Sequence, residues 1–127
     1  MQQILPLPLR YGETNTLNTL AEGGALVSSI SHSGATLLAD IYHMACNGEG
    51  PDCLMPWSAV LSHVHVAERQ DRSAPGRYGE DFRPYFTALR GIVYDGRISI
   101  ECSWTDFDAE VGPAIATLRE QWAAAGV

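Results

Sequence analysis

Lysine is absent from this sequence of 127 residues, and all eight of its Lys and Arg positions are arginine. Without a lysine amine, these residues exclude a P-loop, the protein-kinase phosphate site and Schiff-base chemistry with pyridoxal phosphate or a carbonyl substrate. Positive charge is scarce in general, since 15 acidic residues give a formal net charge of −7. An acidic surface repels phosphate backbones, so we expect no nucleic-acid partner.

Cysteine and long apolar runs are also scarce. Cys46, Cys53 and Cys102 are odd in number and form no Cys-x-x-Cys pair, which argues against a disulfide framework or a cysteine-rich zinc site. No apolar run approaches the roughly 20 residues that cross a membrane. The first ten residues, MQQILPLPLR, lack the basic start and long apolar core of a signal peptide. These features predict a reduced, cytoplasmic protein with no membrane partner.

A repeated rhythm of short apolar run, polar loop and helical pattern fills the chain. The apolar runs cover residues 4–9, 35–39, 63–67 and 97–102. Such alternation predicts an α/β fold of βαβ units with a parallel sheet. Because one unit takes about 30 residues, we expect residues 1–127 to form a single domain of four strand–helix units. That is half of a (β/α)8 barrel, which needs roughly 250 residues.

Apolar residues at helical spacing indicate where the helices lie. They are expected to start near Asn15, to cover residues 54–61, to run from Asp81 to Gly91, and to include Ile115, Leu118 and Trp122. Gly112 and Pro113 are expected to break or kink any helix that continues from Asp106.

Polar side chains close three of the predicted strands: Asp40 ends the second, His65 lies in the third and Glu101 lies near the end of the fourth. Functional groups of parallel α/β folds collect at these strand ends. Carboxylate and imidazole ligands suit Mn²⁺, Co²⁺ or Mg²⁺. The alternative for each residue is ordinary: a strand-ending Asp is often a helix cap, and a lone His is often an unremarkable polar residue.

Four motifs surround these strand ends. They are PLRYGETN (8–15), LLADIYHM (37–44), HVHVAERQDRSAPG (63–76) and YDGRISIE (94–101). In this order and spacing they resemble the C-terminal half of the xylose-isomerase-like sugar phosphate isomerase and epimerase barrels, over about residues 8–122. Within that family the chain is most similar to the D-tagatose/D-psicose 3-epimerase and hydroxypyruvate isomerase types.

The resemblance implies a metal-dependent reaction that moves a proton beside the carbonyl of a small ketose or hydroxy-keto acid. It implies Mn²⁺, or Co²⁺ or Mg²⁺, bound by Asp40, His65 and Glu101. Glu101 is also implied to be the catalytic acid or base. Contacts with substrate oxygens are implied for Glu13, His43 and Arg72.

The chain departs from this family at Leu7, which stands where the family has a second catalytic, metal-binding Glu; residues 1–9 contain no carboxylate at all. The family's N-terminal four units are missing as well. We therefore expect impaired catalysis, with a non-catalytic sugar-binding or structural half-barrel as the alternative. Half a barrel leaves two strand edges unpaired, so a homo-oligomer is expected, unless the chain is a truncated piece of a longer epimerase. A nuclease of the related endonuclease IV type is disfavoured by the negative charge and the few His ligands.

Overall fold

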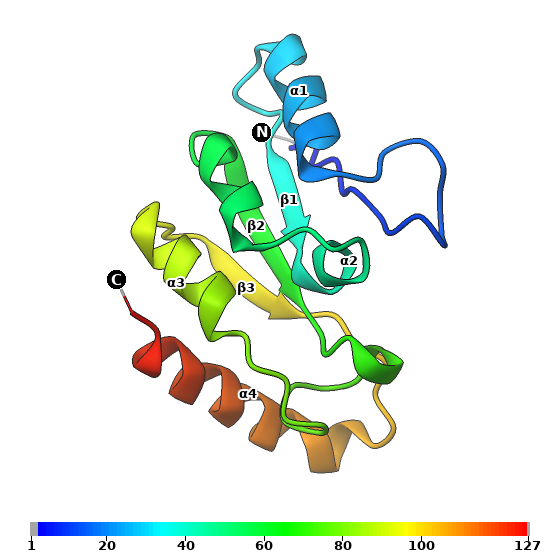
Figure 1. Cartoon of the computed structure of the whole chain (residues 1–127), viewed down its shortest axis with the longest axis vertical. Coiled ribbons are helices and arrows are strands. Elements are labelled where there is room, and N and C mark those ends of the chain that lie inside the picture. The colour runs from blue at the N-terminus through cyan, green and yellow to red at the C-terminus, as the bar shows by residue number, and fades with distance from the viewer. Residues whose placement is uncertain (1–2, 127) are drawn as a thin grey trace.

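A parallel sheet forms the centre of the computed structural model, which describes residues 3–126 (Figure 1). Its three strands lie in the order β1 (Leu37–Asp40), β2 (Leu61–Val66) and β3 (Arg97–Ile100). Parallel neighbours need crossover connections. The segments α2 (Ile41–Cys46) and η1 (Pro51–Trp57) join β1 to β2, and η2 (Gln70–Arg72) and α3 (Arg83–Gly91) join β2 to β3. The predicted α/β class with a parallel sheet is therefore confirmed.

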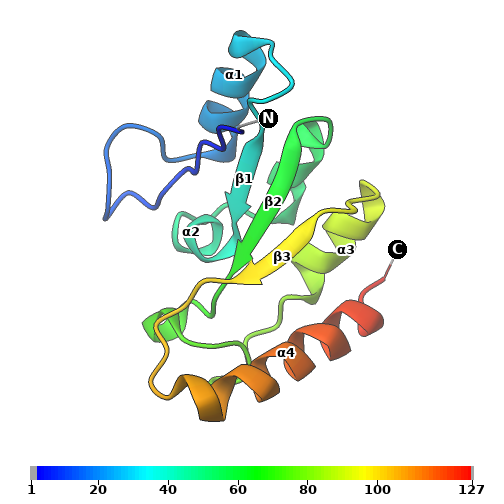
Figure 2. The same cartoon turned by 180° about the vertical axis from the view of Figure 1, so that it is seen from behind.

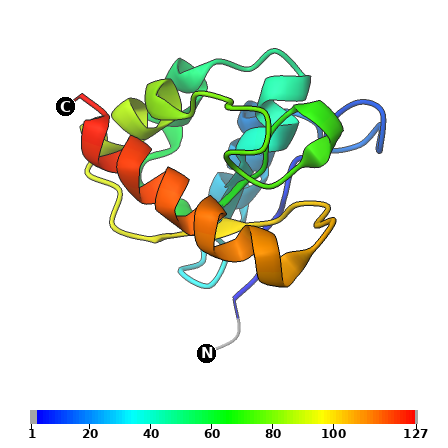
Figure 3. The same cartoon turned by 90° about the horizontal axis from the view of Figure 1, so that it is seen from below.

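Two further helices flank the sheet: α1 (Leu20–Ile30) precedes β1, and α4 (Phe107–Ala124) follows β3. The helices α2 and α3 lie on one side of the strands, as the view from behind and the view from below both show (Figures 2 and 3). None of the described helices combines the length and apolarity needed to cross a membrane.

The two faces of the sheet differ in character because side chains alternate along each strand. Val64 and Val66 of β2 are fully buried in the apolar core, which Phe82 and Phe86 also enter. His63 and His65 alternate with these valines and are only half-buried. The helix-covered face thus holds the core, and the other face is polar.

The expected first strand, residues 4–9, is wrong as a regular strand. Ile4 forms an isolated parallel bridge with Ala35, and the Leu38 N–H donates to the Pro6 carbonyl at 3.2 Å. Pro6 has no N–H with which to complete its own bridge, and Pro8 repeats the interruption. Residues 4–9 therefore run beside β1 as an irregular segment.

The helix expected near Asn15 begins later, at Leu20. Thr19 caps it in a capping box with Glu22. Gly24 is required here by packing, since a Cβ at this position would collide with the Trp57 ring. The two glycines of the helix thus allow neighbouring side chains to pack closely against it, although glycine lowers the intrinsic helix propensity.

Of the break or kink expected at Gly112 and Pro113, the break is wrong, because α4 is continuous over 18 residues from its N-cap at Asp106. A proline in a helix removes one backbone hydrogen bond. Leu118 and Trp122 pack against the core and stabilise the helix beyond that point. The expected helix over residues 54–61 is the 3₁₀ segment η1 instead, and it ends before β2 begins at Leu61.

Candidate active site

Asp40, His65 and Glu101 converge at the C-terminal edge of the sheet. Each offers one ligand atom, and these atoms all lie within 4.8 Å of one another. Asp40 ends β1 and is in register with His65 of β2. Glu101 directly follows β3, and its N–H donates to the Val66 carbonyl at 3.1 Å. The three residues predicted from the strand ends are thus neighbours in space.

Two buried atoms of this cluster lack a hydrogen bond within residues 3–126: Asp40 Oδ2 and His65 Nδ1. They face each other at 3.6 Å, and Glu101 Oε2 lies 2.9 Å from His65 Nδ1 without hydrogen-bond geometry. Buried polar atoms are costly when unpaired, and nearly all find a partner. A divalent cation between them would satisfy both, and two carboxylates with one imidazole suit Mn²⁺, Co²⁺ or Mg²⁺.

The Asp40 carboxylate is divided between two tasks. Its Oδ1 accepts the His43 N–H at 3.2 Å and caps α2, while its Oδ2 faces the cluster. The residue is 2% exposed. Burial raises the pKa of Asp40 from its ordinary value, and the nearby His43 and His65 partly oppose this rise. A cation would favour the ionised form.

His43 is buried beside Asp40. The Arg10 backbone N–H donates to His43 Nδ1 at 3.0 Å, so a neutral ring carries its proton on Nε2. Burial lowers the pKa of His43, which favours the neutral ring. Its Nε2 lies 4.0 Å from Asp40 Oδ2 and 3.4 Å from the Arg72 guanidinium. The ring therefore presents an N–H donor toward the site.

Arg72 and Glu13 form the open side of the site. The Arg72 guanidinium lies 3.6 Å from Glu13 Oε1 and 3.8 Å from Glu101 Oε2. It also lies over the Tyr42 ring, 4.7 Å from the centroid. The three residues predicted to contact substrate thus border the three predicted metal ligands. Tyr42 was missed by the sequence analysis, although an aromatic residue directly before His43 was a usable signal.

Leu7 occupies the edge of β1 opposite to β2. The bonds from Leu38 to Pro6 and between Ile4 and Ala35 set a register that places Leu7 beside Leu38. A Cβ on Gly23 would approach Pro8 to 2.8 Å, so Pro8 faces α1. Alternation then puts Leu7 on the polar face of the sheet, which carries His65. Position 7 therefore lies on the same face of the sheet as the site, two residues before the level of Asp40, and supplies an aliphatic side chain.

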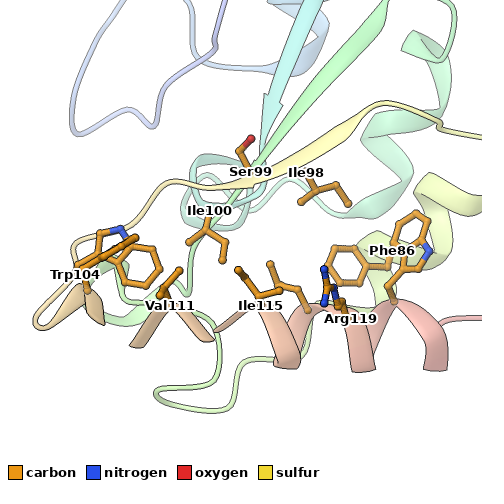
Figure 4. A pocket seen from close by; sticks show the side chains of 11 residues that line it. Phe86, Ile98, Ser99, Ile100, Trp104, Val111, Ile115 and Arg119 are labelled. Atoms are coloured by element: carbon orange, nitrogen blue, oxygen red, sulfur yellow. The ribbon is translucent and has the colours of Figure 1, made fainter. Parts of the chain in front are cut away.

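A hollow of about 640 Å³ lies away from this cluster, between β3 and α4 (Figure 4). Ile98 and Ile100 of β3 and Ile115 of α4 line it. Ile98 and Ile100 alternate along β3 with Ser99, whose hydroxyl lies 3.0 Å from His63 on the polar face. The hollow is mostly apolar, with Ser99 and Arg119 as its polar lining residues, and it contains none of the six predicted site residues.

The chain belongs to the xylose isomerase-like TIM barrel family, whose model matches residues 8–124. It is 31% identical over 115 residues to an L-ribulose 3-epimerase of Methylomonas sp. (strain DH-1), covering 89% of this chain and 40% of that enzyme. It is 35% identical over 95 residues to a ketose 3-epimerase of Arthrobacter globiformis, covering 72% and 32%. A D-allulose 3-epimerase structure from Methylomonas sp. matches with a TM-score of 0.84 at 27% identity, over 94% of this chain and 48% of that one.

These findings confirm the family resemblance and the fold. The parallel sheet with its helices is part of a TIM barrel. The chain spans less than half the length of these relatives.

Proposed function

We propose that this chain carries the metal-binding and substrate-binding part of a ketose or hydroxy-keto acid isomerase or epimerase site. The observation that supports this most is the pair of buried, unpartnered ligand atoms on Asp40 and His65, with Glu101 beside them. The names of the relatives, ketose and ribulose 3-epimerases, support the substrate class.

Asp40, His65 and Glu101 would hold the cation, with Mn²⁺ preferred and Co²⁺ or Mg²⁺ as alternatives. When bound, the cation would act as a Lewis acid toward the substrate carbonyl. Asp40 and His65 are paired in adjacent strands and would define its position. The Glu101 side chain is 50% exposed and retains the freedom to reach a substrate.

Glu101 is proposed as the acid or base that removes and returns the proton on the carbon beside the carbonyl. The His43 Nε2–H and the Arg72 guanidinium would donate hydrogen bonds to substrate oxygens. Glu13 would accept one from a substrate hydroxyl. Charge-assisted bonds from Arg72 fix orientation as well as affinity.

Leu7 limits this chemistry to one side of the substrate. Epimerisation at one carbon needs an acid and a base on opposite faces, whereas proton exchange with solvent needs only one group. We therefore propose that the chain supports exchange and forms epimers poorly. The aliphatic side chain at position 7 also favours a second candidate, a sugar-binding half-barrel without catalysis. That the chain forms a homo-oligomer and that it is a single domain both remain predictions.

Proton exchange in D₂O tests this proposal. The chain with Mn²⁺ is incubated with L-ribulose, D-allulose or hydroxypyruvate, and loss of the carbon-bound proton beside the carbonyl is followed by NMR. We expect exchange by the wild type and a loss of at least about 100-fold in Glu101→Gln. Glu120→Gln, on the exposed surface of α4, is the matched control.

Two other outcomes decide between the candidates. Binding of Mn²⁺ and a ketose without exchange would favour the sugar-binding function. Exchange that is unchanged in Glu101→Gln would remove the proposed acid or base from the site.

A further inference from the structure

A fully buried carboxylate organises the loop between β2 and α3. Glu68 has no exposed surface. Its two oxygens accept five hydrogen bonds, from the Ser73 hydroxyl and from the backbone N–H groups of Gly76, Tyr78, Gly79 and Glu80, at 2.7–3.2 Å. These donors are neutral. A buried charge is tolerated when its lone pairs are satisfied in this way.

The bonds of Glu68 close the loop around Arg72. The Glu68 N–H donates to the Ser73 carbonyl at 2.9 Å, so the backbone forms a ring over residues 68–73. Within this ring Asp71 has φ 57° and Arg72 has φ 50°. Asp enters this left-handed region more readily than most residues, but Arg72 keeps it only where surrounding contacts enforce it. The carboxylate that joins both sides of the loop provides such contacts.

The strained conformation places the Arg72 side chain in the site. Its guanidinium lies over Tyr42 and between the carboxylates of Glu13 and Glu101. The backbone of Arg72 is held from a second side, since the Ser103 N–H donates to its carbonyl at 2.7 Å. The placement of Arg72 thus depends on the loop, whereas Asp40 and His65 are placed by strands.

We infer that Glu68 is a positioning residue for the proposed reaction. Its carboxylate holds the loop in the conformation that presents Arg72 to a substrate oxygen, and Glu68 itself touches neither substrate nor metal. The substrate contact of Arg72 rests on the proposed function. The hold of Glu68 on the loop rests on the five hydrogen bonds alone.

The test compares Glu68→Gln with Glu80→Gln. Glu80 is a half-buried carboxylate of the same loop that accepts one backbone N–H, from Arg69 at 3.0 Å. Glutamine at position 68 turns an amide NH₂ toward N–H donors. We expect the affinity of the Mn²⁺-loaded protein for D-allulose to fall about tenfold in Glu68→Gln, the effect of one misplaced charge-assisted bond. The Mn²⁺ affinity should stay within about twofold, since the ligands lie outside the loop.

A double variant separates positioning from a general structural role. In an Arg72→Ala background, Glu68→Gln should leave the D-allulose affinity unchanged, because the group that it positions is gone. An equal loss in both backgrounds would overturn the inference. If Glu68→Gln fails to fold, Ser73→Ala removes one of the five bonds and should give a smaller loss in the same pattern.

Trypsin supplies a readout that needs no sugar. The chain has no lysine, so trypsin cuts it only at arginine. Cleavage after Arg72 should accelerate in Glu68→Gln relative to cleavage after Arg119 in α4. Unchanged cleavage after Arg72 overturns the role of Glu68. If cleavage after Arg72 accelerates in Glu68→Gln but the wild-type protein binds no D-allulose, the proposed function is contradicted. The role of Glu68 in holding the loop would still stand.

Discussion

The two sides of β1 differ in what they bring to the site. On one side β2 pairs with β1 at four positions and carries His65 opposite Asp40. On the other side residues 4–9 form one isolated bridge, interrupted by prolines, and carry Leu7. Leu7 and His65 lie on the same face of the sheet, but only His65 offers a candidate metal ligand.

This contrast separates two tasks that a ketose epimerase combines. In the proposed function a cation would be held by Asp40, His65 and Glu101, whose ligand atoms the three strands bring within 4.8 Å of one another. In the same proposal, proton transfer on the opposite face of a substrate would need an acid or base at position 7, where leucine can carry no proton. The first task is built into the sheet, and the second depends on one side chain.

Of the changes predicted here, replacement of Leu7 should have the largest effect, because it would give the second neighbour of β1 a carboxylate. We predict that Leu7→Glu raises the rate of epimer formation about 10²–10⁴-fold, the usual contribution of a positioned acid or base. Chromatography of D-allulose incubated with Mn²⁺ and each protein measures this rate. Leu5→Glu adds the same carboxylate two residues earlier and should not raise the rate of epimer formation. Equal rates in the two variants would contradict the placement of Leu7.

A second substitution should weaken the attachment of residues 4–9. A Cβ at Gly23 would lie 2.8 Å from both Pro8 and Leu37. We predict that Gly23→Ala lowers the free energy of unfolding by about 1–3 kcal/mol, as overpacking does. Gly112→Ala is the control, since nothing lies within 4 Å of its Cβ and alanine favours a helix. Urea unfolding measures both, and a stabilised Gly23→Ala protein would show that this contact is not tight.

The smallest predicted effect is on the free energy of unfolding of the metal-free protein. Because burial raises the pKa of Asp40 above its ordinary 3.8, the folded protein keeps a proton that the unfolded chain releases as the pH rises from that value. The free energy of unfolding therefore falls as the pH rises through this window. Asp40→Asn keeps the helix cap and removes this loss, so we predict a gain of about 1 kcal/mol at pH 7.

Urea unfolding of the metal-free proteins at pH 4 and pH 7 measures this gain, which should be larger at pH 7. Asp95→Asn, in an exposed loop, is the control and should change little. A loss of stability in Asp40→Asn at pH 7 would mean that the carboxylate is stabilising even without a metal.

Much of the strand pattern, and the meeting of Asp40, His65 and Glu101 in the candidate site, could be predicted from the sequence. Parallel strands align their C-terminal ends, so Asp40, His65 and Glu101 could be expected to meet without knowledge of the loops. The starts and ends of β2 and β3 differ from the expected ones by two residues or less. Such elements can be identified from the sequence, because the alternating burial of side chains in a sheet produces a periodic pattern of apolar residues.

The remaining features depended on contacts that periodicity does not contain. The prolines disrupt residues 4–9, while Pro113 leaves α4 intact because distant core packing stabilises it. The helix α2 was missed, since its six residues are too short for a repeat, although Asp40 was a usable cap signal. The partners of Glu68 are backbone groups of an irregular loop, which no residue pattern marks.

A calorimetric titration with Mn²⁺ tests the central claim most directly, with the wild type beside Asp40→Asn. The account predicts one Mn²⁺ per wild-type chain and an affinity at least about 100-fold lower in Asp40→Asn. Equal binding by the two proteins, or binding by neither, would contradict a metal site formed by Asp40, His65 and Glu101.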